Sequence, residues 1–396
     1  MSAVMVSAVA SCATIALVTV LTIKKKQLHI WLWTYIGQRI TRLIRPLSSQ
    51  GKVHVLFCVV DHFEPISEGS SAEEERERMK DWLMRFPSLA GRHKDSVGRA
   101  PQHTWFYPGE KYNSEYLDDL VKLCQQGLGE IELHLHHGND TSESLRAKLE
   151  KAIHDFNKHG ALVTHETPPR QVYGFIHGNM ALDNSMGDAA LCGVNDEIAI
   201  LKETGCYADF SMPTAPGISQ TKKINALYYA SDDRCNPKSH DTGIDVEVGQ
   251  PQTGDLMIVQ GPIGLNWSSR KYVIVPKIEN SEIQGSNPPS MARISSWVQT
   301  HVHVKGRPEW IFVKISCHGA EDRSRDALLG NVADQMYSDL EREYRDKPGY
   351  ALHYLTSREL YNIAKAAEAG LSGDPDLYRN YFIPPYRTHP VLTSSR

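Results

Sequence analysis

The stretch VHVLFCVVDHFEP, residues 53–65, decides the fold that the sequence predicts. Residues 53–60 are almost entirely apolar, which is typical of a strand buried on both faces in a parallel sheet. The run ends on Asp61 and His62, so two titratable side chains directly follow the strand. Farther along the chain, apolar runs alternate with amphipathic segments, as expected for repeated βα units.

The same pattern recurs through most of the chain. Further strand-like runs lie at residues 103–108, 130–137, 172–177, 206–211, 255–260, 310–316 and 350–356. Helical patterns lie between them, near residues 71–86, 113–126, 141–159, 187–204, 290–303, 321–346 and 357–369. The sequence therefore predicts an α/β fold, a distorted (β/α) barrel of seven or eight parallel strands, over residues 53–370.

Two segments depart from this rhythm. Residues 212–289 are rich in Pro, Gly, Asn and Asp and contain short β-like pieces, which predicts a hairpin-rich insertion over one face of the barrel. Residues 371–396 contain four prolines, which predicts a surface tail without regular structure.

The N-terminus differs in composition from the body. Residues 1–23 carry no charged side chain and are long enough to cross a hydrocarbon layer of about 30 Å, so we expect a transmembrane anchor helix. Residues 24–52 form a basic amphipathic juxtamembrane segment, whose Trp31 and Trp33 suit the lipid headgroup level. Because positive charge follows the span, we expect a single-pass membrane protein with its body on the cytoplasmic side.

Composition narrows the function classes. The 396 residues are 41% apolar and 23% charged, which argues against intrinsic disorder. A net charge of -4 argues against nucleic acid as a partner. The seven cysteines are scattered singly, as expected for reduced thiols, and the oligomeric state stays open.

Imidazole and carboxyl groups follow several predicted strands. In the run EIELHLHH, residues 130–137, alternation puts Glu132, His134 and His136 on one strand face. Two imidazoles at this spacing can bind one divalent cation if a carboxylate arrives from a neighbouring strand, and Asp61 is the obvious candidate. Later strands end near further polar residues, namely His177, Asn179, Asp209 and His318.

Five motifs occur in a fixed order: VVDHFEP (59–65), EIELHLHHGND (130–140), GFIHGNMALDNS (174–185), LKETGCYADFSMP (201–213) and IFVKISCHGAED (311–322). Together they resemble the successive motifs of the polysaccharide deacetylase (NodB-like) superfamily. They are most similar to its divergent bacterial members, with a barrel of the glycoside hydrolase/deacetylase type. The resemblance implies a divalent metal, usually zinc, and an acetylated glycan as substrate.

The resemblance also implies roles for individual residues. His134 and His136 match the two metal histidines, and His62 stands where the family has a metal-binding Asp. The candidate substrate-binding residues are His177, which stands where the family has Arg, and Asn179, Trp105 and Trp267.

The implied catalytic residues come from three motifs. Asp61 matches the catalytic base, His318 the general acid, and Asp209 the acid that orients this histidine. The implied reaction is metal-dependent hydrolysis of the acetyl amide of an N-acetylated poly- or oligosaccharide, free or lipid-linked, by a carbohydrate deacetylase.

Two alternatives stay open. Because His62 and His177 depart from the family pattern, the barrel could instead be catalytically inactive and bind or scaffold glycans. A glycoside hydrolase on a related barrel would need two carboxylates flanking a sugar, and Asp61 with Asp209 is the pair to consider.

Overall fold

The structure is a computed structural model that describes residues 21, 23–44, 51–166, 169–271 and 275–386. Its strands are β1 Val53–His62, β2 His103–Pro108, β3 Gly129–Leu135, β4 Val163–Glu166, β5 Pro169–His177, β6 Cys206–Asp209, β7 Leu227–Ala230, β8 Ile244–Asp245, β9 Leu256–Val259, β10 Gly264–Lys271, β11 Val275–Glu279, β12 Glu282–Ile283, β13 Trp310–Cys317 and β14 Tyr350–Leu355. Every strand that the sequence predicts is present, with bounds that differ by a few residues.

The helices occupy the predicted segments. They are α2 Leu28–Ile44, α3 Ala72–Ala90, α4 Ser114–Gln125, α5 Ser142–Asn157, α6 Glu197–Thr204, α7 Met291–Thr300, α8 Asp322–Leu329, α9 Asn331–Leu340 and α10 Ser357–Glu368. Local signals explain several boundaries: Ser71, Thr141 and Thr356 each close a capping box at a helix start. The predicted helix near 187–204 is shorter, because only α6 within it is α-helical.

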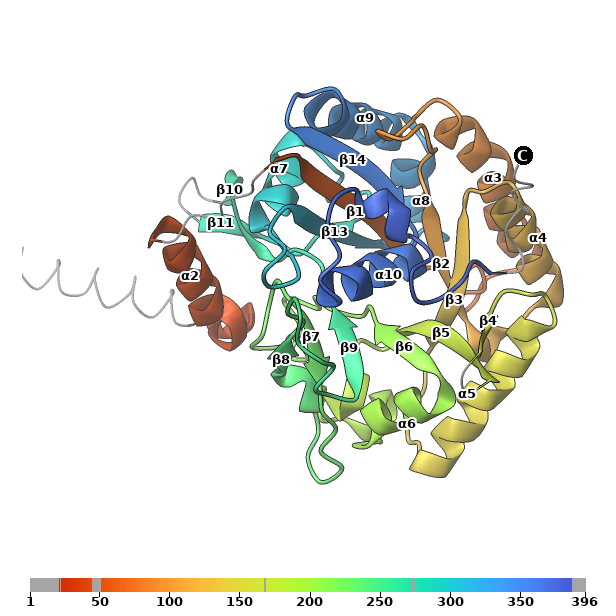
Figure 1. The fold of residues 1–396 in the computed structure, drawn as a ribbon. Helices are drawn as coiled ribbons and strands as arrows, with labels where there is room; N and C mark the ends of the chain where they lie inside the picture. The colour runs from red at the N-terminus through yellow and green to blue at the C-terminus, as the bar shows by residue number, and fades with distance from the viewer. Residues whose placement is uncertain (1–20, 22, 45–50, 167–168, 272–274, 387–396) are drawn as a thin grey trace, which may run out of the picture.

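The fold is mixed α/β with one large, mostly parallel sheet in a barrel-like arrangement (Figure 1). The strand order is β12-β13-β1-β2-β3-β5-β6-β9-β7-β8, and β14 pairs with the first half of β1. The strands from β12 to β9 are paired in parallel, whereas β7 and β8 are antiparallel. The insertion thus gives β9, β7 and β8 to one end of the sheet, β12 to the other edge, and a separate β10–β11 hairpin.

Alternation along β1 divides the core in two. Its odd-numbered side chains pack in an outer core against the surrounding helices: Val55, Phe57 and Val59. Its even-numbered side chains pack in an inner core, where α10 lies within the ring of strands: Leu56, Cys58 and Val60. Each fully buried aliphatic or aromatic side chain contributes about 1.5 to 3 kcal/mol, so both faces of β1 are fixed. This alternation decides which titratable side chains meet at the site.

The N-terminal prediction requires correction. The expected single-pass membrane localisation with a cytoplasmic body is wrong, since no helix among the described residues is long and apolar enough to cross a membrane. The span predicted at 1–23 lies outside the described residues, apart from Leu21 and Ile23. From the segment 24–52, helix α2 forms as expected. Its Trp31 does not face lipid headgroups, because it is fully buried against Ala215, Ile224 and Ile263 of the body.

The C-terminal tail contributes to the core in its described part. Ile383 and Tyr386 are buried with α10 in the inner core. Arg358 of α10 holds this segment by donating to the carbonyl of Ile383 at 2.8 Å, and it pairs with the buried Glu130 of β3 at 2.8 Å. Residues 371–386 therefore pack against the barrel rather than only covering its surface.

Candidate metal centre

Three histidines from three strand ends meet at the inner face of the sheet. His62 ends β1, His134 lies on β3, and His318 follows β13. The ring centroids of His62 and His134 are 4.9 Å apart, and those of His62 and His318 are 4.7 Å apart with the rings stacked. All three positions carry even numbers, like the inner-core residues of β1; β13 pairs directly with β1, and β3 is separated from β1 by β2. The parallel topology therefore gathers imidazoles that are far apart in the sequence.

His136 and Glu64 complete this cluster. The Nε2 atoms of His134 and His136 lie 3.4 Å and 3.6 Å from Oε1 of Glu64. Ligand atoms in a tetrahedral zinc site are about 3.3 Å apart, given bonds of about 2.0 to 2.1 Å. One ligand atom each from Glu64, His134 and His136 lies within 4.8 Å of the other two, and the same holds for His62, Glu64 and His318. The spacing of these atoms suits a divalent cation.

The hydrogen-bonding state of the rings agrees with that chemistry. His62 and His134 are buried, and Nδ1 of His62 and both ring nitrogens of His134 have no hydrogen-bond partner. Buried polar atoms are normally paired, so ring nitrogens without a hydrogen bond, close to the Glu64 carboxylate, fit the ligands of an ion. Burial and the neighbouring His318 lower the pKa of His62 well below its ordinary value, so the ring is neutral and able to bind a metal. The residues present therefore fit a metal centre.

Carboxylates outside the cluster orient the rings. Nδ1 of His136 is 2.7 Å from Oε1 of Glu110, which leaves Nε2 for the cluster. Nδ1 of His318 is 3.5 Å from Oε1 of Glu282. Burial acts to lower the pKa of His318, but the hydrogen bond to Glu282 outweighs it and raises this pKa.

Glu282 is itself held by a buried ion pair. The guanidinium of Arg293 binds both oxygens of Glu279 at 2.8 Å and donates to the backbone carbonyl of Glu282 at 2.7 Å. Arg293 and Glu279 are each 4% exposed at the side chain. This pair from α7 and β11 fixes the segment that carries Glu282 beside His318.

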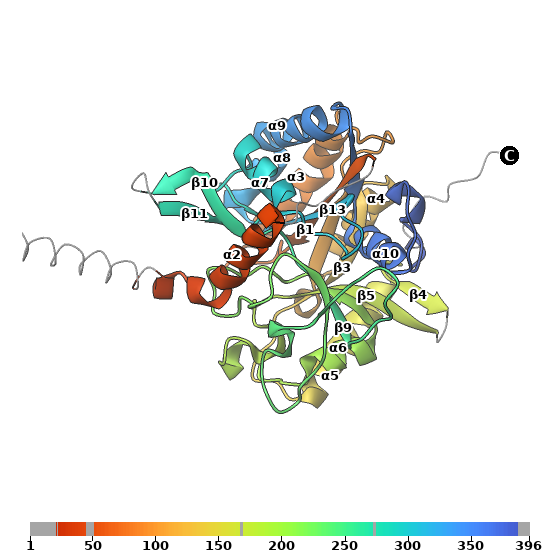
Figure 2. The ribbon, with the colours of Figure 1, turned by 60° about the vertical axis from the view of Figure 1, so that its left-hand side comes forward.

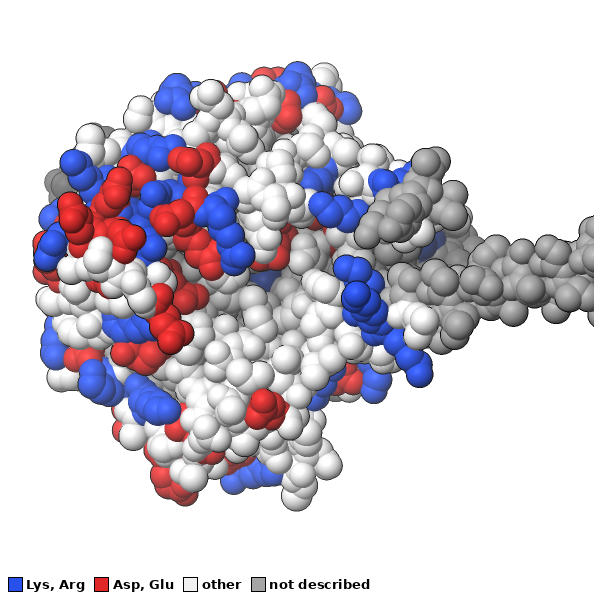
Figure 3. Space-filling view, turned by 180° about the vertical axis from the view of Figure 1, so that it is seen from behind, with Lys and Arg blue, Asp and Glu red and all other residues white. Residues whose placement is uncertain are grey.

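The cluster reaches the surface on one side. The side chains of Glu64, His136 and His318 are 20%, 27% and 22% exposed, whereas His134 is fully buried. Figure 3 shows one face of the molecule, which is hollowed near its middle. The partial exposure of these three side chains lets a substrate approach the cluster from solvent.

Asp61 lies on the other face of β1. Its Oδ2 is 2.8 Å from Nε2 of His103, and its Oδ1 accepts from the backbone N–H of Gly319 at 2.6 Å. As an odd-numbered residue it continues the outer face, beside Trp82. The structure therefore does not bring Asp61 into the cluster of histidines, because successive strand residues point to opposite faces.

Asp209 is also separate from the cluster. It is fully buried, and its oxygens accept from the backbone N–H and the hydroxyl of Ser211 at 3.0 and 2.8 Å. Burial raises the pKa of Asp209 to about 7. Among the described residues Asp209 forms no hydrogen bond or ion pair with His318, and the carboxylate beside His318 is Glu282.

His177 belongs to a second buried group, with His137, Cys192 and Glu197. Nε2 of His137 is 3.1 Å from Oε1 of Glu197, and Sγ of Cys192 donates to Oε2 of Glu197 at 3.4 Å. Nδ1 of His177 accepts from the backbone N–H of Asn179 at 3.2 Å, which assigns its proton to Nε2. A ring protonated there is not a metal ligand, so this group is a structural network around the Glu197 carboxylate.

The remaining predicted substrate-binding residues lie in three places. The side-chain amide of Asn179 donates to the carbonyls of His137 and Leu191 and so ties two loops together. Trp105 is fully buried against Trp82, where no substrate can reach it. Trp267 is 54% exposed, on the β10–β11 hairpin.

Three carboxylates of this centre are not among the predicted site residues: Glu64, Glu110 and Glu282. Glu64 follows the first strand by two residues and keeps the even numbering of His62, which is a signal in the sequence. Glu110 follows the second strand almost directly, so the sequence also indicates that it lies at the carboxyl ends of the strands, near His62. Glu282 lies in the irregular insertion, where no periodicity indicates which residue faces the strand ends.

Comparisons with known proteins give distant structural likenesses. No family model and no curated protein matches the chain. An alpha-mannosidase from Enterococcus faecalis is 13% identical with a TM-score of 0.39, covering 82% of this chain and 30% of its own. A GH57-type branching enzyme from Pyrococcus horikoshii is 10% identical with a TM-score of 0.40, covering 77% and 69%. A glycoside hydrolase/deacetylase from Parabacteroides distasonis is 11% identical with a TM-score of 0.40, covering 81% and 72%.

This chain thus spans less than a third of the length of the alpha-mannosidase. The three proteins are of glycoside hydrolase or glycoside hydrolase/deacetylase type, and none of the three is named as a NodB-like deacetylase. Because all three TM-scores lie below 0.5, these likenesses carry no inference about the reaction.

Proposed function

We propose that this chain is a metal-dependent hydrolase that removes acetyl groups from an N-acetylated poly- or oligosaccharide. The observation that supports it is the group formed by Glu64, His134 and His136, whose possible ligand atoms all lie within 4.8 Å of one another, beside the buried ring of His62. Two imidazoles and a carboxylate leave a fourth position open for water or substrate, as in catalytic zinc sites. A divalent metal bound there, with zinc as the first candidate, would polarise the acetyl carbonyl and acidify a water.

The chain's own residues divide the ligand and acid roles. Glu64 lies in the ligand group with His134 and His136, so it would hold the metal and does not take the role of base that the resemblance gives to Asp61. His318 lies on the other side of His62 and is paired with Glu282, so it is placed to protonate the departing amine. Asp61 instead fixes the backbone of Gly319, next to His318.

The test uses the full-length chain and two separate measurements. Metal content by mass spectrometry should give about one equivalent for the wild type, and His134→Ala should lose it. Acetate release from N-acetylglucosamine oligomers should stop in His318→Gln while the metal is retained, because only the general acid is removed. His154→Ala, on the exposed face of α5, is the matched control and should change neither measurement.

Three results would contradict this proposal. A wild-type chain without stoichiometric metal would remove its basis. Metal binding without acetate release would favour a glycan-binding barrel. Cleavage of glycosidic bonds that depends on two carboxylates would favour a glycoside hydrolase instead.

A further inference from the structure

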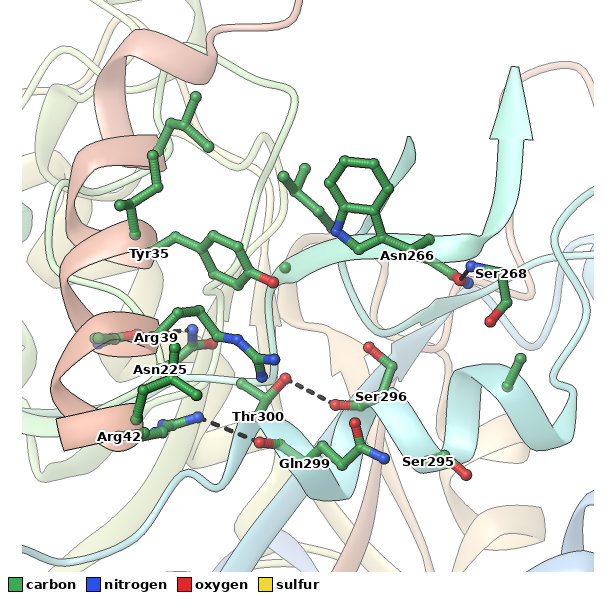
Figure 4. A pocket seen from close by; sticks show the side chains of 18 of the residues that line it. Tyr35, Arg39, Arg42, Asn225, Asn266, Ser268, Ser295, Ser296, Gln299 and Thr300 are labelled. Atoms are coloured by element: carbon green, nitrogen blue, oxygen red, sulfur yellow. Dashed lines mark hydrogen bonds between the residues drawn. The ribbon is translucent and has the colours of Figure 1, made fainter. Parts of the chain in front are cut away.

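A pocket of about 790 Å³ lies apart from the metal centre, between α2, the start of β10 and α7 (Figures 2 and 4). Its α2 wall is firmly docked. Trp31 is buried in the body, and the side-chain amide of Gln38 donates to the carbonyl of Ile224 at 2.8 Å. Because these contacts fix α2 without any ligand, the pocket is preformed and ordering it costs little on binding.

The charge in this pocket is of one sign. Arg39 and Arg42 line it, and no lining residue is an acid. Among the described residues neither guanidinium forms an ion pair with a carboxylate; Arg42 donates to the backbone carbonyl of Gln299 at 3.2 Å. Burial and the neighbouring Arg39 lower the pKa of Arg42, as expected for two like charges held together.

This arrangement contrasts with the chain as a whole, which carries a net charge of -4. In Figure 3 the charged side chains on the right, the side on which α2 lies, are mainly basic, whereas acidic and basic side chains are intermixed on the left. Two guanidiniums without a carboxylate are a site for an anion such as a carboxylate or a phosphate.

The other lining residues suit a sugar. Trp267 offers an exposed indole on which the apolar face of a sugar ring can stack. Figure 4 shows the Tyr35 hydroxyl, the Arg39 guanidinium and the Ser296 hydroxyl directed into the space between α2 and α7. Hydroxyl and amide groups in the middle of a pocket match sugar hydroxyls better than an acyl chain.

We infer that this pocket binds an acidic sugar unit, a sugar bearing a carboxylate or a phosphate, of the glycan on which the metal centre acts. Arg39 and Arg42 bind the anionic group and Trp267 stacks on the ring. The inference rests on the proposed function for the identity of the glycan, and it adds that the substrate is an anionic polymer.

The test is a binding measurement on the full-length chain by calorimetry and tryptophan fluorescence. The probes are a trimer of galacturonic acid, a neutral trimer of galactose, inorganic phosphate, and vesicles of phosphatidylglycerol. We expect the acidic trimer to bind at least tenfold more tightly than the neutral one, and phosphate to compete with it. Arg39→Gln and Arg42→Gln should each weaken binding about tenfold or more, as for charged hydrogen bonds, and Trp267→Ala should also weaken it.

The control variant is Arg234→Gln, whose exposed guanidinium lies outside the pocket; it should bind like the wild type. Equal binding of the acidic and neutral trimers, or binding that survives both Arg39→Gln and Arg42→Gln, would overturn the inference. So would vesicle binding without sugar binding, which would identify a lipid as the occupant.

The two proposals fail separately. Arg39→Gln and Arg42→Gln should still release acetate from short neutral N-acetylglucosamine oligomers, because these carry no anionic group. If the wild type binds the acidic trimer but releases no acetate, the proposed deacetylase activity alone is rejected. Acetate release without any preference for acidic sugar would reject the pocket alone.

Discussion

Breaking the buried pair of Arg293 and Glu279 should reveal how strongly it holds the segment beside the metal centre. Both oxygens of Glu279 accept from Arg293 at 2.8 Å, and Oε1 also accepts from the indole N–H of Trp297 at 2.9 Å. Arg293→Met leaves the carboxylate buried without its cation and removes the donor to the carbonyl of Glu282. Removing one partner of a buried ion pair costs about 3 to 5 kcal/mol.

A double-mutant cycle separates the pair from the other contacts. Glu279→Gln keeps an acceptor for Trp297 but removes the charge, so the variant that combines it with Arg293→Met has no unpaired buried charge. We expect this double variant to be more stable than Arg293→Met alone by about 2 kcal/mol or more, as a coupling between directly contacting groups. Urea unfolding of the four proteins gives each free energy.

The same variants test the link to the centre. If Glu282 depends on Arg293, the proposed acetate release should fall in Arg293→Met even at temperatures where the protein stays folded. A loss of stability below about 1 kcal/mol in Arg293→Met, or additive effects of the two substitutions, would refute the reasoning about the pair. Full activity in the folded Arg293→Met protein would refute its link to Glu282.

Two further substitutions test the packing around the site. A Cβ on Gly319 would lie 2.1 Å from Oδ2 of Asp61, so Gly319→Ala should lower the free energy of unfolding by about 1 to 3 kcal/mol and disturb the neighbouring His318. The control is Gly37→Ala, whose Cβ meets nothing within 4 Å and which should be neutral or stabilising. Thermal unfolding of both variants checks the two expectations. Arg358→Met leaves the buried Glu130 carboxylate without this guanidinium and should cost about 3 to 5 kcal/mol; urea unfolding indistinguishable from wild type would contradict the importance of that pair.

The sequence was most informative where structure is local. Strands such as 53–61 and 103–108 were predicted almost to the residue, because buried parallel strands read as continuous apolar runs bounded by turn residues. The pairing of His134 with His136 followed from the two-residue period of a strand. The predicted membrane localisation was wrong. Helix α2 packs on the body through Trp31, and the burial of Trp31 against Ile224 depends on a distant segment that no local pattern reveals.

The candidate centre shows the same division. The apolar runs and helical patterns determined a mixed α/β body with imidazoles and carboxyl groups after its strands, since side-chain periodicity is a property of the chain itself. Only the tertiary structure decided that His62 turns inward and Asp61 outward, and that Glu282 closes beside His318. The physical reason is that a strand face becomes the inner or the outer face only when the sheet curves and one of its sides packs around α10. This curvature brings residues that are distant in the sequence within bonding distance of one another.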